Sequence, residues 1–387
     1  MKKFSIILIV LLFVYSCTRK EEKVIIPKNL PTYHIKVDAN SFFNWDKYIN
    51  KVDIIPLETT NNSLVGFLNK GIVRDSNIFI LDYKLHSLLN FDLSGNFLGK
   101  IGKRGQGPNE YLEIRDFTVS DSSIYILDYK EIHSYDIKTK KHKISWSIFH
   151  DKAFNPSNFI IISNDHYYLW ASNPDIWDKD KKKHYRLKEI KNKKVKEEYF
   201  EYKYKSSDDP RFYLSGDNCY IKPIDGDYIL YKLKEDSIFA SFALDFGKLA
   251  LSAEEINRLR NSKEKNAYLK SNHYKSISNV YEIGKFIYFN CIGPESIMYE
   301  GLINTHTGQV VVGKWDYKKS PRFFFSDGTY LYAYYEPFTL SEKIAEKERI
   351  NLCFNSAFDA LKKIDISNNI VIVRYSLKNE ITMNFKK

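Results

Sequence analysis

The sequence is poor in the residues that cross-link a fold or bind a structural metal. Only four cysteines and three methionines occur among its 387 residues. No C-x₂-C pair and no H-E-x-x-H motif is present, which excludes the common zinc spacings. If Cys17 is modified, Cys219, Cys291 and Cys353 remain, and three thiols cannot all pair within one chain. We expect no metal and no cofactor, and the sequence leaves open whether any disulfide forms.

Motifs for nucleotide binding and nucleophilic hydrolysis are absent as well. Gly105-Gln106-Gly107 lacks the third glycine of a dinucleotide loop and runs into Pro108, and there is no Walker lysine or G-x-S-x-G elbow. Asp225-Gly226-Asp227 carries calcium-type ligands, but this pattern is more typical of a hairpin turn. The sequence therefore favours a binding or scaffold protein over an enzyme, and leaves a hydrolase or lyase as the alternative.

The formal net charge of +11 is not gathered into a recognition motif. Basic residues are scattered along the chain. The densest run, 179–196, is typical of a solvated hairpin, although it could also hold an anionic glycan or a lipid headgroup. We expect no nucleic-acid partner.

The N-terminus predicts export and a lipid anchor. Lys2 and Lys3 precede an apolar run, Phe4–Tyr15, that is too short to cross a bilayer, and Ser16-Cys17 follow. This order resembles a bacterial lipobox, although an ordinary signal peptide with a chance cysteine is the alternative. We expect a signal peptide over 1–16, lipid attachment at Cys17, a flexible tether over 17–31, and an outer-membrane lipoprotein facing the cell surface or the periplasm.

An internal repeat is the most informative pattern in the sequence. Ile78–Lys84 (IFILDYK) and Ile124–Lys130 (IYILDYK) differ at one position, and each follows a turn signal and precedes further strand-like runs. Weaker copies begin at His166, Tyr228, Phe286 and Tyr330. With 29 tyrosines and 26 phenylalanines, the composition also favours β-sheet. Repeats of this length with four short strands are typical of propeller blades.

We predict an all-β fold, a six-bladed β-propeller of four-stranded antiparallel blades over 32–387, with helical insertions in blades four and six. Ser252–Glu255 carries a capping box, and 339–361 has apolar residues at helical spacing. Because the second insertion interrupts the last unit, Asn369–Leu377 should return as its third strand. Val52–Glu58 can then supply the fourth and close the ring without an open edge.

Three segments carry a resemblance to a known family. They are Ile55–Glu58 (IPLE), Phe91–Gly102 (FDLSGNFLGKIG) and Gly102–Tyr111 (GKRGQGPNEY), in which Asn109 stands where glycine is commoner. The chain resembles the six-bladed β-propeller lipoproteins of Bacteroidetes, relatives of NHL-repeat propellers, over about residues 50–380. The resemblance implies a propeller and a binding or scaffolding role, without defining the ligand.

Candidate site residues come from the channel of the predicted propeller. The innermost strand of each blade lines that channel, so the residues that begin these strands should surround one mouth. Counting back from the six turn signals gives three cations and three amides: Lys70, Arg115, Asn158, Asn218, Asn279 and Arg322. These side chains suit sugar hydroxyls, carboxylates or phosphates, or they simply cap strand ends and bind water. We predict that this mouth binds a polar ligand, anionic or glycan in character, or a protein partner, and we assign no catalytic residue; any enzyme activity should also lie there.

Overall fold

The computed structural model describes residues 24–36, 41–129, 131–148, 154–172, 183–203, 212–222, 224–234, 237–263, 266–316, 320–339, 365 and 367–379. Cys17 and nearly all of the helix predicted over 339–361 lie outside these residues. Within the described part of the chain, no helix is long and apolar enough to span a membrane.

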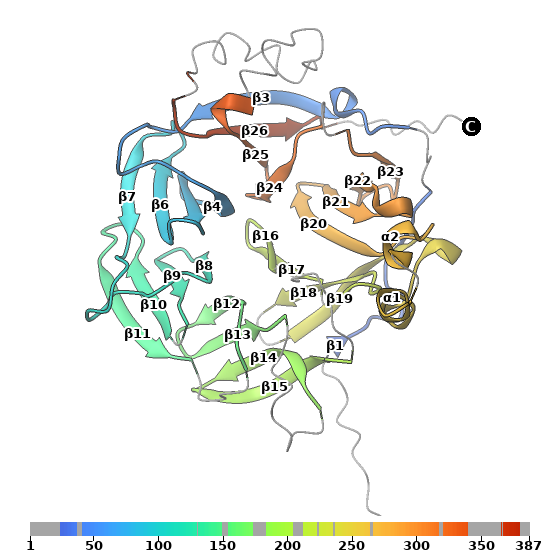
Figure 1. Cartoon of the computed structure of the whole chain (residues 1–387), viewed down its shortest axis with the longest axis horizontal. Helices are drawn as coiled ribbons and strands as arrows, with labels where there is room; N and C mark the ends of the chain where they lie inside the picture. The colour runs from blue at the N-terminus through green and yellow to red at the C-terminus, as the bar shows by residue number, and fades with distance from the viewer. Residues whose placement is uncertain are drawn as a thin grey trace, which may run out of the picture.

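The fold is an all-β propeller of four-stranded antiparallel blades arranged around a central axis (Figure 1). Four blades are separate sheets. The first two comprise β4 (Leu68–Arg74), β5 (Asn77–Asp82), β6 (Ser87–Asp92) and β7 (Phe97–Ile101), then β8 (Asp116–Val119), β9 (Ser123–Leu127), β10 (Glu131–Asp136) and β11 (His142–Ser147). The other two comprise β12 (Asn158–Ser163), β13 (His166–Trp170), β14 (Tyr185–Lys191) and β15 (Lys194–Glu201), then β20 (Ser276–Ile283), β21 (Phe286–Ile292), β22 (Met298–Asn304) and β23 (Val310–Lys314).

The remaining strands form one ten-stranded sheet instead of two further separate sheets. One half contains β16 (Phe212–Ser215), β17 (Asn218–Ile221), β18 (Ile229–Lys234) and β19 (Ser237–Asp245), with β1 (Val24–Ile25) and β2 (Thr32–His34) on its outer edge. The other half contains β24 (Phe323–Ser326), β25 (Leu331–Tyr335), β26 (Val371–Leu377) and β3 (Ile49–Pro56). The halves join only where Ser215 pairs in parallel with Ser326. The two innermost strands therefore approach each other across the axis, and this departs from the expected set of six separate sheets.

The apolar runs of the repeat bury both faces, as their lack of alternation predicts. On β5, Ile78 and Ile80 pack in one cluster with Phe325 of β24. Phe79 and Leu81 point the other way and pack with residues of β8 and β9. β5 therefore contributes to two hydrophobic cores, one on each side of its sheet.

The N-terminal segment runs along the outside of the ring. β1 and β2 pair in parallel with β19, and Phe42 bridges to Lys314 on β23. β3 then pairs antiparallel with β26, from Val371 opposite Pro56 to Leu377 opposite Ile49. The segment expected near 52–58 therefore does supply a strand beside β26. Part of the expected flexible tether is ordered, because β1 gains backbone hydrogen bonds on the exposed edge of β19.

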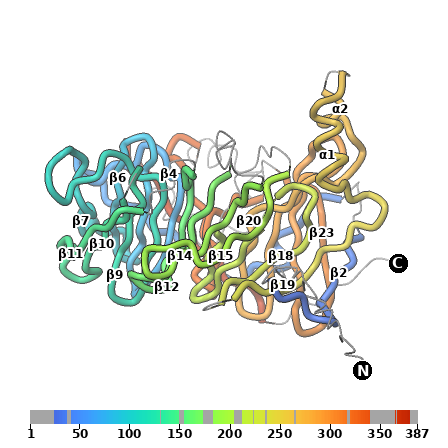
Figure 2. Tube along the Cα trace, turned by 90° about the horizontal axis from the view of Figure 1, so that it is seen from below, coloured from blue at the N-terminus to red at the C-terminus, as the bar shows by residue number. Residues whose placement is uncertain are grey.

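Helix α1 (Ala253–Arg260) begins with the predicted capping box, in which Ser252 and Glu255 bond to each other's backbone. It follows β19 and precedes β20, so it lies between blades and not within one. The short helix α2 (Ala267–Lys270) comes next, and Figure 2 shows both helices projecting from one face of the disc. The described residues also form three 3₁₀ turns, η1 (Trp45–Lys47), η2 (Gly247–Leu249) and η3 (Pro294–Ser296).

Candidate functional site

The axis of the ring has two ends, which differ in chemistry. We call the end where the innermost strands begin the N-mouth, and the end where they finish the C-mouth. A small cavity of about 60 Å³ lies on the N-mouth side, and its lining includes Lys70, Asn158 and Asn279. The structure therefore brings three of the six predicted residues together around one cavity.

A buried carboxylate organises this cavity. Asp116 on β8 accepts a hydrogen bond from the Lys70 ammonium at 2.7 Å and one from the Asn158 amide at 3.3 Å. It also accepts from the backbone N–H of Phe159 at 3.1 Å. Because these partners come from β4 and β12, one side chain joins three neighbouring inner strands. The charge of Lys70 is thus largely compensated inside the protein.

Asn279 lines the same cavity, and Arg322 stands beside it. Asn279 adopts a left-handed φ of 50° at an irregularity in β20 and donates to Asn290 Oδ1 at 3.0 Å. Arg322 precedes β24, is exposed, and places its guanidinium 5.2 Å from the centroid of the Phe324 ring, which lines the same cavity.

A second, larger hollow of about 370 Å³ lies beside this cavity and is lined by polar side chains. Two of the predicted residues, Arg115 and Asn158, face it together with Asn69, Tyr83, Glu113, Asn155 and Ser157. Arg115 donates to Glu113 at 2.9 Å and to the Pro156 carbonyl at 3.1 Å, and it also bonds to Asn155. Its guanidinium lies 4.4 Å from the centroid of the Tyr129 ring. The hollow thus combines amides, one cation, one acid and the ring of Tyr83, with the Tyr129 ring beside Arg115.

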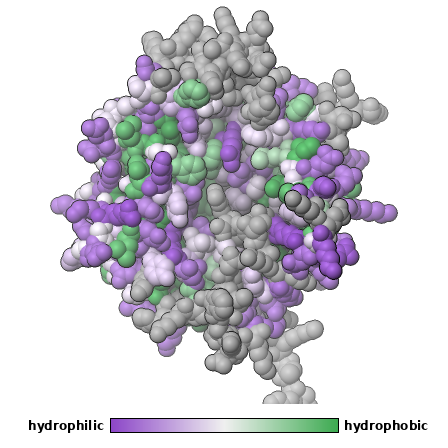
Figure 3. All heavy atoms as spheres, in the orientation of Figure 1, coloured by the Kyte–Doolittle hydropathy of each residue, from purple (hydrophilic) through white to green (hydrophobic). Residues whose placement is uncertain are grey.

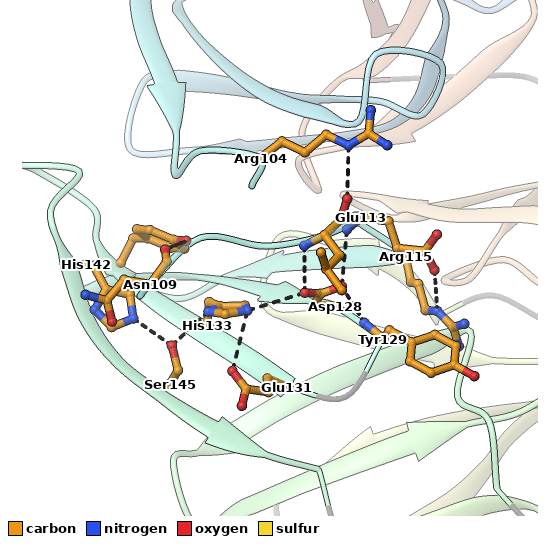
Figure 4. A network of polar contacts seen from close by, with 12 residues as sticks. Arg104, Asn109, Glu113, Arg115, Asp128, Tyr129, Glu131, His133, His142 and Ser145 are labelled. Atoms are coloured by element: carbon orange, nitrogen blue, oxygen red, sulfur yellow. Dashed lines mark hydrogen bonds and ion pairs between the residues drawn. The ribbon is translucent and has the colours of Figure 1, made fainter. Parts of the chain in front are cut away.

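A polar network holds the loop that carries Glu113 and Arg115 (Figure 4). Asp128 accepts from the backbone N–H groups of Leu112 at 2.9 Å and Glu113 at 3.2 Å, and His133 lies behind it at 3.7 Å. Burial opposes ionisation of Asp128, but His133 and these N–H groups outweigh it and hold its pKa below the usual value. The carboxylate therefore fixes the backbone from which Arg115 extends.

The glycine-rich motif forms the turn before this loop. Asn109 adopts a φ of 66°, in the left-handed region that asparagine tolerates better than most residues. This explains why asparagine can stand where glycine is commoner. Arg104 donates to the Leu112 carbonyl at 3.0 Å and ties the turn to the loop.

Asn218 does not belong to the N-mouth. It begins β17, after the turn that ends β16, and so lies at the C-mouth, where its amide donates to Glu282 at 2.9 Å. The prediction was wrong because Asp225-Gly226-Asp227 was used as the turn between the first two strands of the unit. That turn actually precedes β18, and Gly216-Asp217 forms the earlier one.

The C-mouth opens into a cleft of about 720 Å³. Arg74, at the end of β4, crosses this mouth. It donates to Asp217 at 2.7 Å and also pairs with Asp121, so three blades meet through one guanidinium. Glu282 accepts from Tyr220 at 2.6 Å as well as from Asn218, and Lys232 lies 3.7 Å away.

The sequence did not identify five of the seven residues around the 370 Å³ hollow. Asn69 precedes a predicted residue, and Asn155 and Ser157 come from the loop before β12. The aspartate-tyrosine pair shared by the two strongest repeat copies offers a usable signal, because it places Tyr83 and Tyr129 at equivalent positions in adjacent blades. Among the residues that the structure describes, no group of three His, Cys, Asp or Glu side chains could hold a metal ion.

A ring of four-stranded antiparallel blades around an axis with two mouths defines a β-propeller. The chain belongs to the family described as a domain of unknown function, DUF4934, whose sequence pattern matches residues 31–376. No curated protein matches it.

Three solved structures are similar in fold. A Bacteroides fragilis protein that bears the name of an exported protein matches with a TM-score of 0.72 at 16% identity, over 91% of this chain and 100% of that one. A DUF4221-family member from Bacteroides vulgatus gives 0.48 at 12%, over 85% and 97% of the two chains. Regucalcin, a calcium-binding protein from Agrobacterium tumefaciens, gives 0.40 at 12%, over 91% and 98%. The first supports the propeller fold, and we draw nothing from the other two.

Proposed function

We propose that this chain is an exported, lipid-anchored, six-bladed propeller that binds a saccharide in the hollow beside its N-mouth. The six blades are the four separate sheets and the two halves of the ten-stranded sheet, because a single residue pair joins those halves. Export and the anchor at Cys17 rest on the N-terminal sequence, and the similar Bacteroides fragilis protein bears the name of an exported protein.

The chemistry of the 370 Å³ hollow carries the proposal. Asn69, Asn155 and Asn158 each offer an amide that both donates and accepts, as a sugar hydroxyl does. Arg115 and Glu113 add one multi-donor and one acceptor, so that neutral and acidic sugars could both be bound. A volume of this size suits a small ligand or a short segment of a chain.

Exposed aromatic rings flank the same hollow. Tyr83 and Tyr129 are 50% and 49% exposed, although tyrosine rings are usually more buried. Each ring offers an apolar face with a polar hydroxyl, which suits the mixed surface of a pyranose. Figure 3 shows that hydrophobic residues are also exposed on the side of the ring that carries β4–β7. The tyrosine rings together with the amides distinguish this hollow from a channel mouth whose polar side chains only bind water.

The test is binding to an array of bacterial and plant oligosaccharides, followed by calorimetry on the best one. We expect Tyr83→Ala and Asn155→Ala each to weaken that affinity at least tenfold, because each removes a direct contact. Leu98→Ala and Gln309→Ala, at exposed positions away from the hollow, should bind as the parent does. The proposal fails if no oligosaccharide binds, or if all four variants lose affinity equally.

A further inference from the structure

The cleft at the C-mouth differs from the N-mouth hollow in its lining, and the proposed saccharide site does not use it. It lies where β4, β8, β12 and β16 finish, and its volume of about 720 Å³ is nearly twice that of the N-mouth hollow. Volumes in this range accept a ligand of drug size. The question is which ligand chemistry its surface fits.

The floor of the cleft is apolar. β12 contributes three consecutive isoleucines, Ile160, Ile161 and Ile162, and β8 and β16 contribute Val119 and Leu214. Ile162 is 42% exposed within the cleft. Ile160 and Ile161 pack against the cores on the two sides of the blade, whereas Ile162, near the end of β12, stays exposed. The exposed surface would be covered by an apolar ligand.

Three cations line the rim of the cleft, and two of them, Lys232 and Lys234, stand apart from the paired Arg74. Arg74, Lys232 and Lys234 line it, against one lining acid, Asp217, which is already paired with Arg74. Arg74 is also paired with Asp121, so both aspartates are held on exposed turns at one side of the mouth. Lys232 is 31% exposed and its nearest acid, Glu282, is 3.7 Å away, a separation that leaves the ammonium able to meet a second anion.

We propose that the C-mouth cleft is a second binding site, for a small amphiphile with an apolar body and an anionic head group. The apolar body lies on the isoleucines of β12, and the head group meets Lys232 and Lys234. Burial of the apolar body supplies most of the affinity, since it removes both the ligand surface and Ile162 from water. The two lysines set the preference for an anion over a neutral head.

Calorimetric titration with decanoate, and with the neutral 1-decanol, tests the site on the full-length propeller domain. We expect decanoate to bind one per chain and Ile162→Glu to weaken it at least tenfold, because a carboxylate would then stand in the apolar floor. Ile144→Glu is the matched control, since Ile144 is 49% exposed on the outer strand β11. Ile144→Glu should bind decanoate as the parent does. Both glutamate variants should have the melting temperature of the parent.

The double variant Lys232→Gln/Lys234→Gln separates the head group from the body. It should lose at least threefold in affinity for decanoate and nothing for decanol. The site is refuted if decanoate does not bind saturably, or if the two glutamate variants lose affinity equally. The assignment of an anionic head is refuted if the lysine variant binds decanoate as tightly as the parent. Oligosaccharide binding at the N-mouth is a separate measurement, so either proposal can fail alone.

Discussion

Lys70 and Asp116 form a 2.7 Å ion pair that joins the first strands of two neighbouring blades. The Asp116 side chain is almost fully buried, and Asn158 and the Phe159 N–H bring a third blade to the same carboxylate. Two of the residues predicted to face a ligand are therefore engaged in holding the inner strands together. The proposed saccharide site therefore depends on Arg115 and the amides beside it.

Replacing Asp116 should destabilise the ring. Asp116→Ala leaves Lys70 without its main anionic partner and removes the acceptor for the Phe159 N–H. Loss of one member of a buried pair costs about 3 kcal/mol of unfolding free energy. Urea denaturation measures this loss. Asp121→Ala removes an aspartate that is 83% exposed and should change the unfolding free energy little. Equal effects of the two substitutions would contradict the role of Asp116.

The turn at Gly95 couples the first blade to the closing strand. Gly95 has a φ of +91°, and a Cβ there would overlap the carbonyl oxygen of Pro56, at the end of β3. The Gly95 carbonyl also accepts from the Glu58 N–H at 2.8 Å. Gly95→Ala should therefore strain both the turn and the packing of β3.

Gly308 separates these two causes, because its φ is +71° but a Cβ there would meet nothing within 4 Å. We expect Gly308→Ala to cost about 1 kcal/mol from backbone strain alone. Gly95→Ala should cost at least about 1 kcal/mol more, because of the overlap with Pro56. Thermal unfolding of both variants measures the two losses of stability. If they lose equal stability, the close approach to β3 is unimportant.

The sequence was sufficient to predict the elements that local physics determines. Ile78–Leu81 has apolar residues at successive positions, so both faces had to be buried, and the four-stranded repeat pointed to stacked blades as the way to bury them. The pairing of β3 with β26 followed from counting strands in the last unit. In the same way, the Ser252 capping box located the start of α1.

The parts that could not be predicted depend on which turn precedes which strand. Asn218 was misplaced because the Asp225-Gly226-Asp227 turn has the stronger composition, although Gly216-Asp217 forms the earlier hairpin. The pairing of Ser215 with Ser326 arises where two distant strands cross the axis, and no local pattern encodes it. Asn69 and Asn155 meet at the hollow for the same reason, since loops from different blades bring them together.

The proposed anchor depends on a single residue. Cys17→Ala should move the protein from the membrane fraction to the soluble fraction, because every acyl chain would be attached at that thiol. Cell fractionation followed by immunoblotting measures the distribution. Cys353→Ala serves as the control and should stay with the membrane. An unchanged distribution of Cys17→Ala would reject lipid attachment at this position.

A pH-dependent contact links the N-terminal segment to the propeller. Trp45, in η1, donates its indole N–H to the buried Glu300 of β22 at 3.0 Å, and the Tyr288 hydroxyl donates to the same carboxyl group at 3.1 Å. Burial raises the pKa of Glu300 from 4.5 to about 8, although these hydrogen bonds lower it in part. The folded protein thus keeps a proton on Glu300 that the unfolded chain loses above pH 4.5.

Stability should consequently fall as the pH rises from about 4.5 to 8, because the folded state binds one more proton than the unfolded state in this window. The slope contributed by Glu300 is at most about 1.4 kcal/mol per pH unit. Glu300→Gln cannot ionise and keeps an acceptor for Trp45, so its unfolding free energy should fall less steeply over this range. Above pH 8 the unfolding free energies of the parent and of Glu300→Gln should change with pH at the same slope. Urea denaturation at several pH values measures both slopes. Glu254→Gln, at an exposed position of α1, is the control, and its unfolding free energy should depend on pH as that of the parent does. If Glu300→Gln shows the same pH dependence as the parent, Glu300 is not its source.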